Sequence, residues 1–407
     1  MADPLVTPFK PVTLSERVLL LLLAAVQFTH IMDFMIMMPL GPQLMRQLAI
    51  RPDQFTWLLS AYTWSAGIAG LVATLYVDRF DRRPLLLVMY AGFAVGTLAC
   101  ALSHSYEQLL AARLVSGAFG GVSAALVMTI VSDVMPPSRR AAGIGIVMTA
   151  FSAASALGVP AGLKLAEWFD WESPFVFIAI VAAVMWVVAL LGMPALRGHL
   201  TTGGPSGKWR NLIALIGNRN VQWGLLLMIC MMAAHFTVIP FLSPYLVSNV
   251  GLPESQLFLV YMTGGVLTVF TGPLAGRWAD RFGRWRVYAI MTAVASVVIL
   301  MLTNAPPLSL WAVLMLAGFF FVFASGRFGP GQAIASLAVK PAQRGAFMSL
   351  SSCVRDLASG GIGVLAGVVV KRDGDTGPYH GYHLLGWIAV VCGLISLWVA
   401  RRVKVVG

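Results

Sequence analysis

Charged residues are scarce in this sequence. They make up 11% of its 407 residues, whereas 58% are hydrophobic. A soluble domain carries roughly 25% charged residues. The composition therefore excludes an ordinary water-soluble enzyme. Paired cysteines are also missing, because the four cysteines lie in apolar runs at unrelated spacings, which favours small buried side chains over disulfides.

Acidic residues are few as well, 16 against 28 basic ones, and the net charge is +12. The basic residues sit in short runs between apolar segments and do not interleave with aromatics, so we expect no nucleic-acid partner. No HExxH pair, nucleophile–base set or phosphate-binding loop is present. We therefore expect no metal, no cofactor and no enzymatic activity, and a membrane-embedded enzyme or receptor is the least favoured class.

Apolar runs of the ~20 residues needed to cross a bilayer occur twelve times. They span 18–40, 54–77, 85–104, 109–131, 142–165, 175–195, 221–247, 257–279, 287–304, 309–338, 345–370 and 383–400. The pattern predicts an all-α membrane protein of twelve transmembrane helices, with the lipid bilayer as its surroundings.

The basic residues also predict the orientation. If the N-terminus is inside, the cytoplasmic segments carry 20 Lys and Arg, and the opposite side carries five. Cytoplasmic loops are enriched in Lys and Arg. We therefore expect a multi-pass protein of the cell (inner) membrane with both termini cytoplasmic.

The two halves of the chain repeat. Asp78-Arg79-Phe80 follows the second apolar run, and Asp280-Arg281-Phe282 follows the eighth, 202 residues later. The same offset relates Pro42 to Pro244, Gly158 to Gly360 and Asp33 to His235. We predict two pseudo-symmetric six-helix bundles, 1–195 and 221–407, joined by a cytoplasmic linker, 196–220. Repeats of this kind place the substrate site between the bundles near the midplane.

These motifs resemble those of the major facilitator superfamily. Gly276–Arg286 is similar to its signature loop, and Gly70–Arg83 to the partner loop, although Thr74 and Asp81 replace glycines there. Arg113 with Gly117 resembles the fourth-helix motif, with Ser116 in place of glutamine, and Gly158–Gly162 a fifth-helix antiporter motif. Met32-Asp33-Phe34 is similar to the first helix of drug:proton antiporters and of sugar and nucleoside exporters.

The resemblance implies a gating role for the positions of these loops that match the family motif. They are Asp78, Arg79, Arg82, Arg83, Gly276, Asp280, Arg281, Gly283 and Arg284, together with Gly158, Pro160 and Gly162 of the fifth helix. The loop carboxylates would help to hold the inner side closed, by pairing with nearby arginines or a facing helix N-terminus. The competing interpretation takes the arginines as solvated markers of topology. The glycines and proline would shape a helix where the bundles touch.

Asp33 and Arg113 are the first candidates for proton coupling. Only two of the acidic residues, Asp33 and Asp356, lie well inside apolar runs, where a charge costs roughly 2.5–3.5 kcal/mol. Counting from the run ends places Asp33 and Arg113 at about the same depth in the outer half. An arginine favours the ionised carboxylate and burial favours the protonated one. The alternative is a permanent structural pair. His235 would face Asp33 and relay protons, or is simply hydrogen-bonded.

Arg327 and Asp356 lie at equal distances from the loop between their runs, which predicts a buried pair at one depth. Such a pair would act as a gate or bind an anionic group. The alternative is a purely structural ion pair. Polar, aromatic and methionine side chains at helical spacing complete the predicted substrate cavity. The cavity candidates are Gln27, His30, Phe34, Met37, Phe320, Phe323, Arg327, Ser352 and Asp356.

The sequence thus predicts a monomeric, proton-coupled secondary transporter that exports small organic or drug-like solutes by alternating access. Import by proton symport or by uniport is the alternative. The expected partners are a small-molecule substrate and protons.

Overall fold

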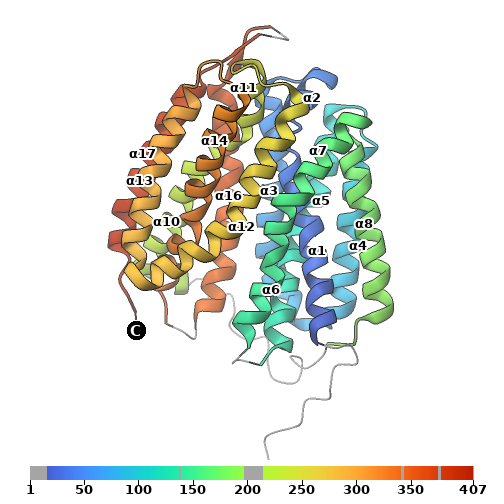
Figure 1. Cartoon of the computed structure of the whole chain (residues 1–407). Helices are drawn as coiled ribbons and strands as arrows, with labels where there is room; N and C mark the ends of the chain where they lie inside the picture. Colours follow the sequence, from blue (N-terminus) through green and yellow to red (C-terminus); the bar gives the residue numbers. More distant parts are fainter. Residues whose placement is uncertain (1–15, 137–138, 197–213, 341–342, 375–376, 407) are drawn as a thin grey trace, which may run out of the picture.

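The computed structural model describes residues 16–136, 139–196, 214–340, 343–374 and 377–406. Figure 1 shows two groups of near-parallel helices side by side, one from each half of the chain. Residues 197–213, which hold most of the predicted linker, lie outside the described part.

The first half contains α1 (Glu16–Ile36), α2 (Gly41–Gln47), α3 (Pro52–Tyr76), η1 (Val77–Arg79), α4 (Arg82–Ala101), α5 (Tyr106–Val134), α6 (Arg140–Ala153), η2 (Ala154–Gly158), α7 (Val159–Trp168) and α8 (Ser173–Gly192). The second half contains α10 (Arg219–Phe236), η4 (Ile239–Phe241), α11 (Leu242–Ser248), η5 (Glu254–Gln256), α12 (Leu257–Phe282), α13 (Arg284–Thr303), α14 (Leu310–Phe320), η6 (Phe321–Ser325), α15 (Phe328–Ser336), α16 (Arg344–Val369) and α17 (Tyr382–Arg402). A short hairpin of β1 (Lys371–Arg372) and β2 (Tyr379–His380) precedes α17.

Eleven helical stretches of the described chain are long and apolar enough to cross a membrane. The remaining long helix, α3, has 25 residues and lies against α5 and α16. Four polar side chains, Ser60, Tyr62, Thr63 and Ser65, fall on one short stretch of it. With α3 as the twelfth span, the predicted fold of twelve transmembrane helices in two six-helix bundles is confirmed.

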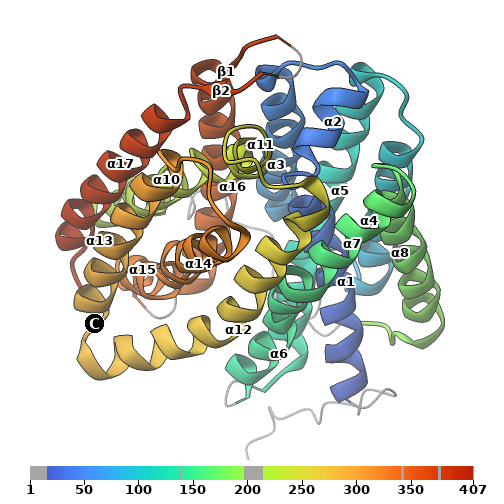
Figure 2. The same ribbon diagram turned by 45° about the horizontal axis from the view of Figure 1, so that its top comes forward.

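The first span of each half breaks at the same place. The sequence predicts a continuous helix over 18–40, but α1 ends at Ile36 and α2 begins at Gly41; in the second half α10 ends at Phe236 and α11 begins at Leu242. The apolar run hides this break because the intervening residues are hydrophobic. α2 and α11 lie side by side at the top of Figure 1 and again in Figure 2. A Cβ on Gly41 would lie 3.3 Å from Cγ of Pro244. We call this the outer side, following the predicted orientation, and the opposite side the inner side.

The fifth span widens where its proline enters. Residues Ala154–Gly158 form a π-helical turn, in which the N–H of Val159 bonds to the carbonyl of Ala154. Pro160 has no N–H for the carbonyl of Ala156, and its ring clashes with a regular helical turn. A wider turn relieves both problems. A second π-helical turn, Phe321–Ser325, divides the tenth span between α14 and α15.

Candidate functional site

A buried ion pair between α1 and α5 forms the centre of the N-terminal bundle. Nη1 of Arg113 lies 2.8 Å from Oδ2 of Asp33, and neither side chain has exposed surface. Thr97 of α4 donates a hydrogen bond of 3.1 Å to Oδ1 of Asp33. The predicted meeting of Asp33 and Arg113 at one depth is confirmed, while their part in proton coupling stays a prediction.

The guanidinium of Arg113 still has donors to offer. Its Nε and Nη2 atoms are buried without a hydrogen-bond partner among the described residues. Its Cζ lies 4.2 Å from the centroid of the Tyr62 ring on α3. Gly117 allows this close approach, since a Cβ there would lie 2.8 Å from Cα of Tyr62. Arg113 is therefore held in place by one carboxylate and one aromatic face, with two donors unused.

Tyr62 connects this ion pair to the boundary between the bundles. Its hydroxyl lies 2.7 Å from Nδ1 of His30. Its ring stacks on Phe34 at a centroid distance of 5.7 Å, and Phe34 lies 6.0 Å from Phe236 of the other bundle. The sequence pattern identified His30 and Phe34 but missed Tyr62. The only signal for Tyr62 was its place in the polar stretch of the second span.

His235 lies in a separate aromatic pocket of the C-terminal bundle. Its ring stacks parallel to Phe320 at 6.0 Å and meets Phe328 edge-on at 5.3 Å. The next residue of α10, Phe236, contacts Phe34 of the N-terminal bundle. Successive residues on a helix point about 100° apart, so the predicted position of His235 opposite Asp33 is wrong. The imidazole points into its own bundle instead.

Arg327 lies beside this pocket, in the turn between η6 and α15, and is 1% exposed. No ion pair joins it to Asp356 in the described structure, so the predicted pair is wrong. The tenth span packs its α15 portion against α10 and α13, whereas Asp356 faces α3. A Cβ on Gly67 of α3 would lie 3.2 Å from Cβ of Asp356. The two side chains instead face different neighbouring helices.

The other cavity candidates fall into two groups. Met37 and Phe320 have no exposed surface and belong to the hydrophobic core, so both pack inside the protein in this conformation. Gln27 is also buried, with Oε1 unpartnered in the described chain. Phe323 is partly exposed and stacks on Phe319 at 6.2 Å. Ser352, also partly exposed, accepts a 3.2 Å hydrogen bond from Nη2 of Arg355.

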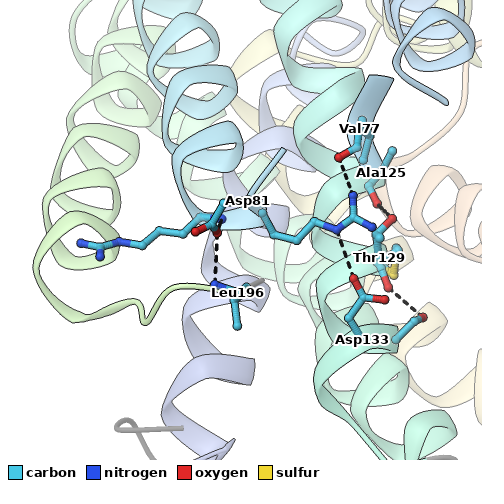
Figure 3. Close-up of polar contacts among 10 residues, drawn as sticks. Val77, Asp81, Ala125, Thr129, Asp133 and Leu196 are labelled. Carbon is cyan, nitrogen blue, oxygen red and sulfur yellow. Dashed lines mark hydrogen bonds and ion pairs between the residues drawn. The ribbon is translucent and has the colours of Figure 1, made fainter. Parts of the chain in front are cut away.

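The loop after the second span ties one bundle together. Nε of Arg82 lies 3.1 Å from Asp133 of α5, and its Nη1 donates to the carbonyl of Val77 at 2.7 Å (Figure 3). Asp81 caps α4 and accepts a 3.1 Å hydrogen bond from the N–H of Leu196, where the chain leaves α8 (Figure 3). Asp81, which stands at a glycine position of the family motif, thus secures the segment that leads into the linker.

The remaining loop positions differ in their surroundings. Arg83 donates to the carbonyl of Leu190 at 2.7 Å, and Arg79 is exposed. The side chain of Asp78 lies outside the described structure. In the second loop Asp280, Arg281, Gly283 and Arg284 are exposed, and a Cβ on Gly276 or on Gly283 would meet nothing within 4 Å. The described part of this loop therefore makes no ion pair in this conformation.

The glycines of the fifth-helix motif face α1 of their own bundle. A Cβ on Gly158 would lie 3.2 Å from Sδ of Met32, and one on Gly162 would lie 2.8 Å from Cδ1 of Ile36, both on α1. Both the π-helical turn and α7 contact α12 of the other bundle, and Nζ of Lys164 lies 4.2 Å from the centroid of the Phe258 ring. A Cβ on Gly265 of α12 would lie 2.6 Å from Cα of Ala156. The helix that holds Gly158, Pro160 and Gly162 thus lies where the bundles touch, as predicted, while its two glycines face α1.

The bundles meet most closely along α3 and α16. The Ser60 hydroxyl donates to the carbonyl of Gly360 at 2.7 Å, and Nε1 of Trp64 donates to the carbonyl of Leu357 at 3.0 Å. Small residues permit this approach, because a Cβ on Gly360 would lie 2.5 Å from Cδ1 of Trp64. We call this contact, from Thr56 with Gly367 to Gly70 with Cys353, the outer seam.

An ion pair closes the same side. Nη1 and Nη2 of Arg46 lie 2.5 and 2.9 Å from the two carboxylate oxygens of Glu254. We call Arg46 with Glu254 the outer ion pair. In the described chain, the hydrogen bonds between bundles all lie between this pair and the level of Trp64. The first two turns of α16, from Arg344 to Ser352, make none. The bundles are thus joined on the outer side in this conformation.

Comparisons with known proteins agree with this architecture. The model of the Major Facilitator Superfamily matches residues 23–364 and 224–404. An uncharacterized MFS-type transporter of Bacillus subtilis, YceJ, is 24% identical over 81% of this chain and 83% of its own length. A probable sugar efflux transporter of Mannheimia succiniciproducens is 24% identical over 84% and 82%.

Solved structures share the fold. A D-xylose-proton symporter superposes with a TM-score of 0.76 at 16% identity, covering 94% of this chain and 97% of the symporter. A bacterial homolog of the human lysosomal transporter Spinster gives 0.74 at 16% identity, covering 95% and 97%. The chain therefore belongs to the major facilitator superfamily and is a membrane transporter of small solutes rather than an enzyme.

Proposed function

We propose that this transporter is a proton-coupled exporter of small organic or drug-like solutes, working as a monomer by alternating access. The observation that carries the proposal is the fully buried pair of Asp33 and Arg113, whose arginine retains two unpartnered donors. A carboxylate inside a membrane protein marks a functional site by default, because its charge is costly there.

Protonation of Asp33 would change the balance of charge around Arg113. The neutral carboxyl group no longer compensates the guanidinium, and the 2.8 Å contact loses most of its electrostatic attraction. Arg113 then has its charge and donors available for another acceptor. A single proton thus switches this centre between a closed internal pair and an open binding group.

Tyr62 offers a route from this centre to the outer seam. Its ring lies under the Arg113 guanidinium, and on the same helix Ser60 and Trp64 make the hydrogen bonds to α16. A movement of Arg113 therefore bears on the helix that closes the outer side. Physical continuity of this kind supports coupling, and double-mutant measurements test it.

Export is favoured over import by the resemblance of the first and fifth spans to those of antiporters and by the likeness to a probable sugar efflux transporter. The excess of Lys and Arg on the inner side supports an inner-membrane location with both termini cytoplasmic. His235 is proposed as a second proton site in the C-terminal bundle. The loop arginines, Asp78 and Asp280 are proposed to close the inner side in the opposite conformation.

The test uses the purified full-length protein in vesicles with a pH-sensitive dye inside. Sugars, nucleosides, organic carboxylates and drug-like cations are added outside in turn. Antiport makes the lumen alkaline as a compound enters, whereas symport makes it acidic. Asp33→Asn should abolish the pH change while exchange of the labelled compound continues. The control is Asp170→Asn, an exposed carboxylate outside the site. A normal pH change with Asp33→Asn would refute the assignment.

A further inference from the structure

The charges inside the two bundles do not balance. Four charged side chains are buried in the described chain: Asp33, Arg82, Arg113 and Arg327. Arg113 pairs with Asp33, and Arg82 pairs with Asp133. Arg327 alone has no carboxylate partner there. An uncompensated buried charge is strongly unfavourable, so its presence calls for an anion from outside the chain.

We propose that Arg327 binds the carboxylate of the transported compound, so that the substrate is a small organic carboxylate. This inference rests on the proposed transport function and specifies its substrate class. Nε and Nη2 of Arg327 are buried without a partner among the described residues. These two atoms form the side of a guanidinium that binds both oxygens of a carboxylate. Arg51 of this chain holds Asp53 in that way, with Nε and Nη2 at 3.0 and 2.7 Å.

The surroundings of Arg327 suit a polar group attached to an apolar body. Nη1 lies beside Gly393 of α17, where an added Cβ would be 3.9 Å from it and 3.4 Å from Cγ2 of Thr292. The Thr292 hydroxyl and Nδ1 of His235 are also buried and unpartnered within the described residues. The aromatic rings of Phe320 and Phe328 flank His235. Unpartnered polar groups and aromatic rings thus lie in the buried surroundings of Arg327, with Thr292 on its Nη1 side.

The backbone beside Arg327 allows the site to open. Nε and Nη2 are enclosed in this conformation, so a ligand reaches them only when the tenth span moves. The π-helical turn Phe321–Ser325 ends one residue before Gly326, and Arg327 follows as a turn residue between η6 and α15. Turns of this type weaken the regular helical ladder and mark bends at functional sites. Arg327 is therefore carried by the part of its helix that bends most readily.

Binding to the purified full-length protein tests this site without any proton gradient. Benzoate, 4-hydroxybenzoate and acetate are compared with benzamide, 4-hydroxybenzamide and acetamide, which have the same shape without the charge. Inorganic phosphate is the third kind of probe. Affinity is read from the thermal midpoint as a function of ligand concentration. We expect at least one carboxylate to bind about tenfold or more tightly than its amide.

The variants assign that preference to one residue. Arg327→Gln should remove it, and Arg327→Lys should keep part of it, because lysine supplies a charge without the two-pronged geometry. Arg219→Gln, an exposed arginine at the start of α10, should leave it unchanged. The unliganded Arg327→Gln protein should unfold at the same or a higher temperature, since it loses an uncompensated charge.

Three results would overturn the proposal. They are equal binding of carboxylates and amides by the wild type, a preference that survives Arg327→Gln, and tighter binding of phosphate than of every carboxylate. Failure of the Asp33→Asn test would leave these binding results interpretable, because they involve no proton movement.

Discussion

Replacing Gly360 by alanine should force the outer seam apart. The new Cβ would lie 2.5 Å from Cδ1 of Trp64 and 2.6 Å from its Nε1, on a ring that also donates to the carbonyl of Leu357. Carbon atoms in contact need roughly 3.5–4.0 Å, so the helices must separate by about 1 Å or the indole must leave its hydrogen bond. Overpacking of this size costs about 1–3 kcal/mol. The outer-closed state should lose population relative to the outer-open state by roughly 5- to 150-fold.

The assay is an electron-spin distance measurement between labels at Glu107→Cys and Asn304→Cys, which lie at exposed outer ends of the two bundles. The four native cysteines are replaced by serine. Gly361→Ala is the matched control, because a Cβ there meets nothing within 4 Å. Both variants gain about 1 kcal/mol of helix propensity, so this term cancels. An identical distance distribution for the two alanine variants would refute the reasoning.

Three further outcomes follow from the contacts. Glu254→Gln removes one charge of the outer ion pair, and exposed pairs contribute about 0–1 kcal/mol. The ratio of outer-closed to outer-open populations, read from the same label distances, should therefore change by at most about fivefold, and not at all in 1 M salt. A change that is independent of salt would contradict this. Asp133→Asn takes the charge from beside the buried Arg82 and should lower thermal stability by about 1–3 kcal/mol, so an unchanged midpoint would count against the pair. In a double-mutant cycle, Arg327→Ala and Asp356→Ala should act additively on the free energy of unfolding to within about 0.5 kcal/mol. Strong coupling between the two substitutions would instead indicate a direct contact between the two side chains.

Depth in the membrane could be predicted from the sequence, because each residue of a helix adds ~1.5 Å along its axis. Counting from the ends of apolar runs therefore brought Asp33 and Arg113 to the same level, and the structure joins them at 2.8 Å. The same count placed Arg327 level with Asp356, where no pair forms. Depth does not determine which way a side chain points around its helix. That direction depends on which helices are neighbours, and an apolar run has no strong polar face to reveal it.

Interruptions of helices were harder to predict than their existence. The break after Ile36 lies in an uninterrupted apolar run, so hydropathy gives no sign of it. Its counterpart after Phe236 could have been found through the repeat, since Pro42 and Pro244 lie in the two short helices that follow the breaks. The residues that hydrogen-bond across the outer seam, Ser60 and Trp64, have no motif. Their role depends on the small residues of α16 that face them.

The electrical balance of transport links the two proposed sites. If the substrate is a monocarboxylate and leaves the cell as one proton enters, each cycle moves two charges, and a membrane potential of 100 mV, negative inside, drives it with about 4.6 kcal/mol. Import of the same anion with one proton moves no net charge and gains nothing from the potential. A current that appears with benzoate and disappears in Arg327→Gln would therefore support export of an anion. Electroneutral uptake that acidifies the lumen would favour the symport alternative, while leaving Arg327 as the residue that binds the carboxylate.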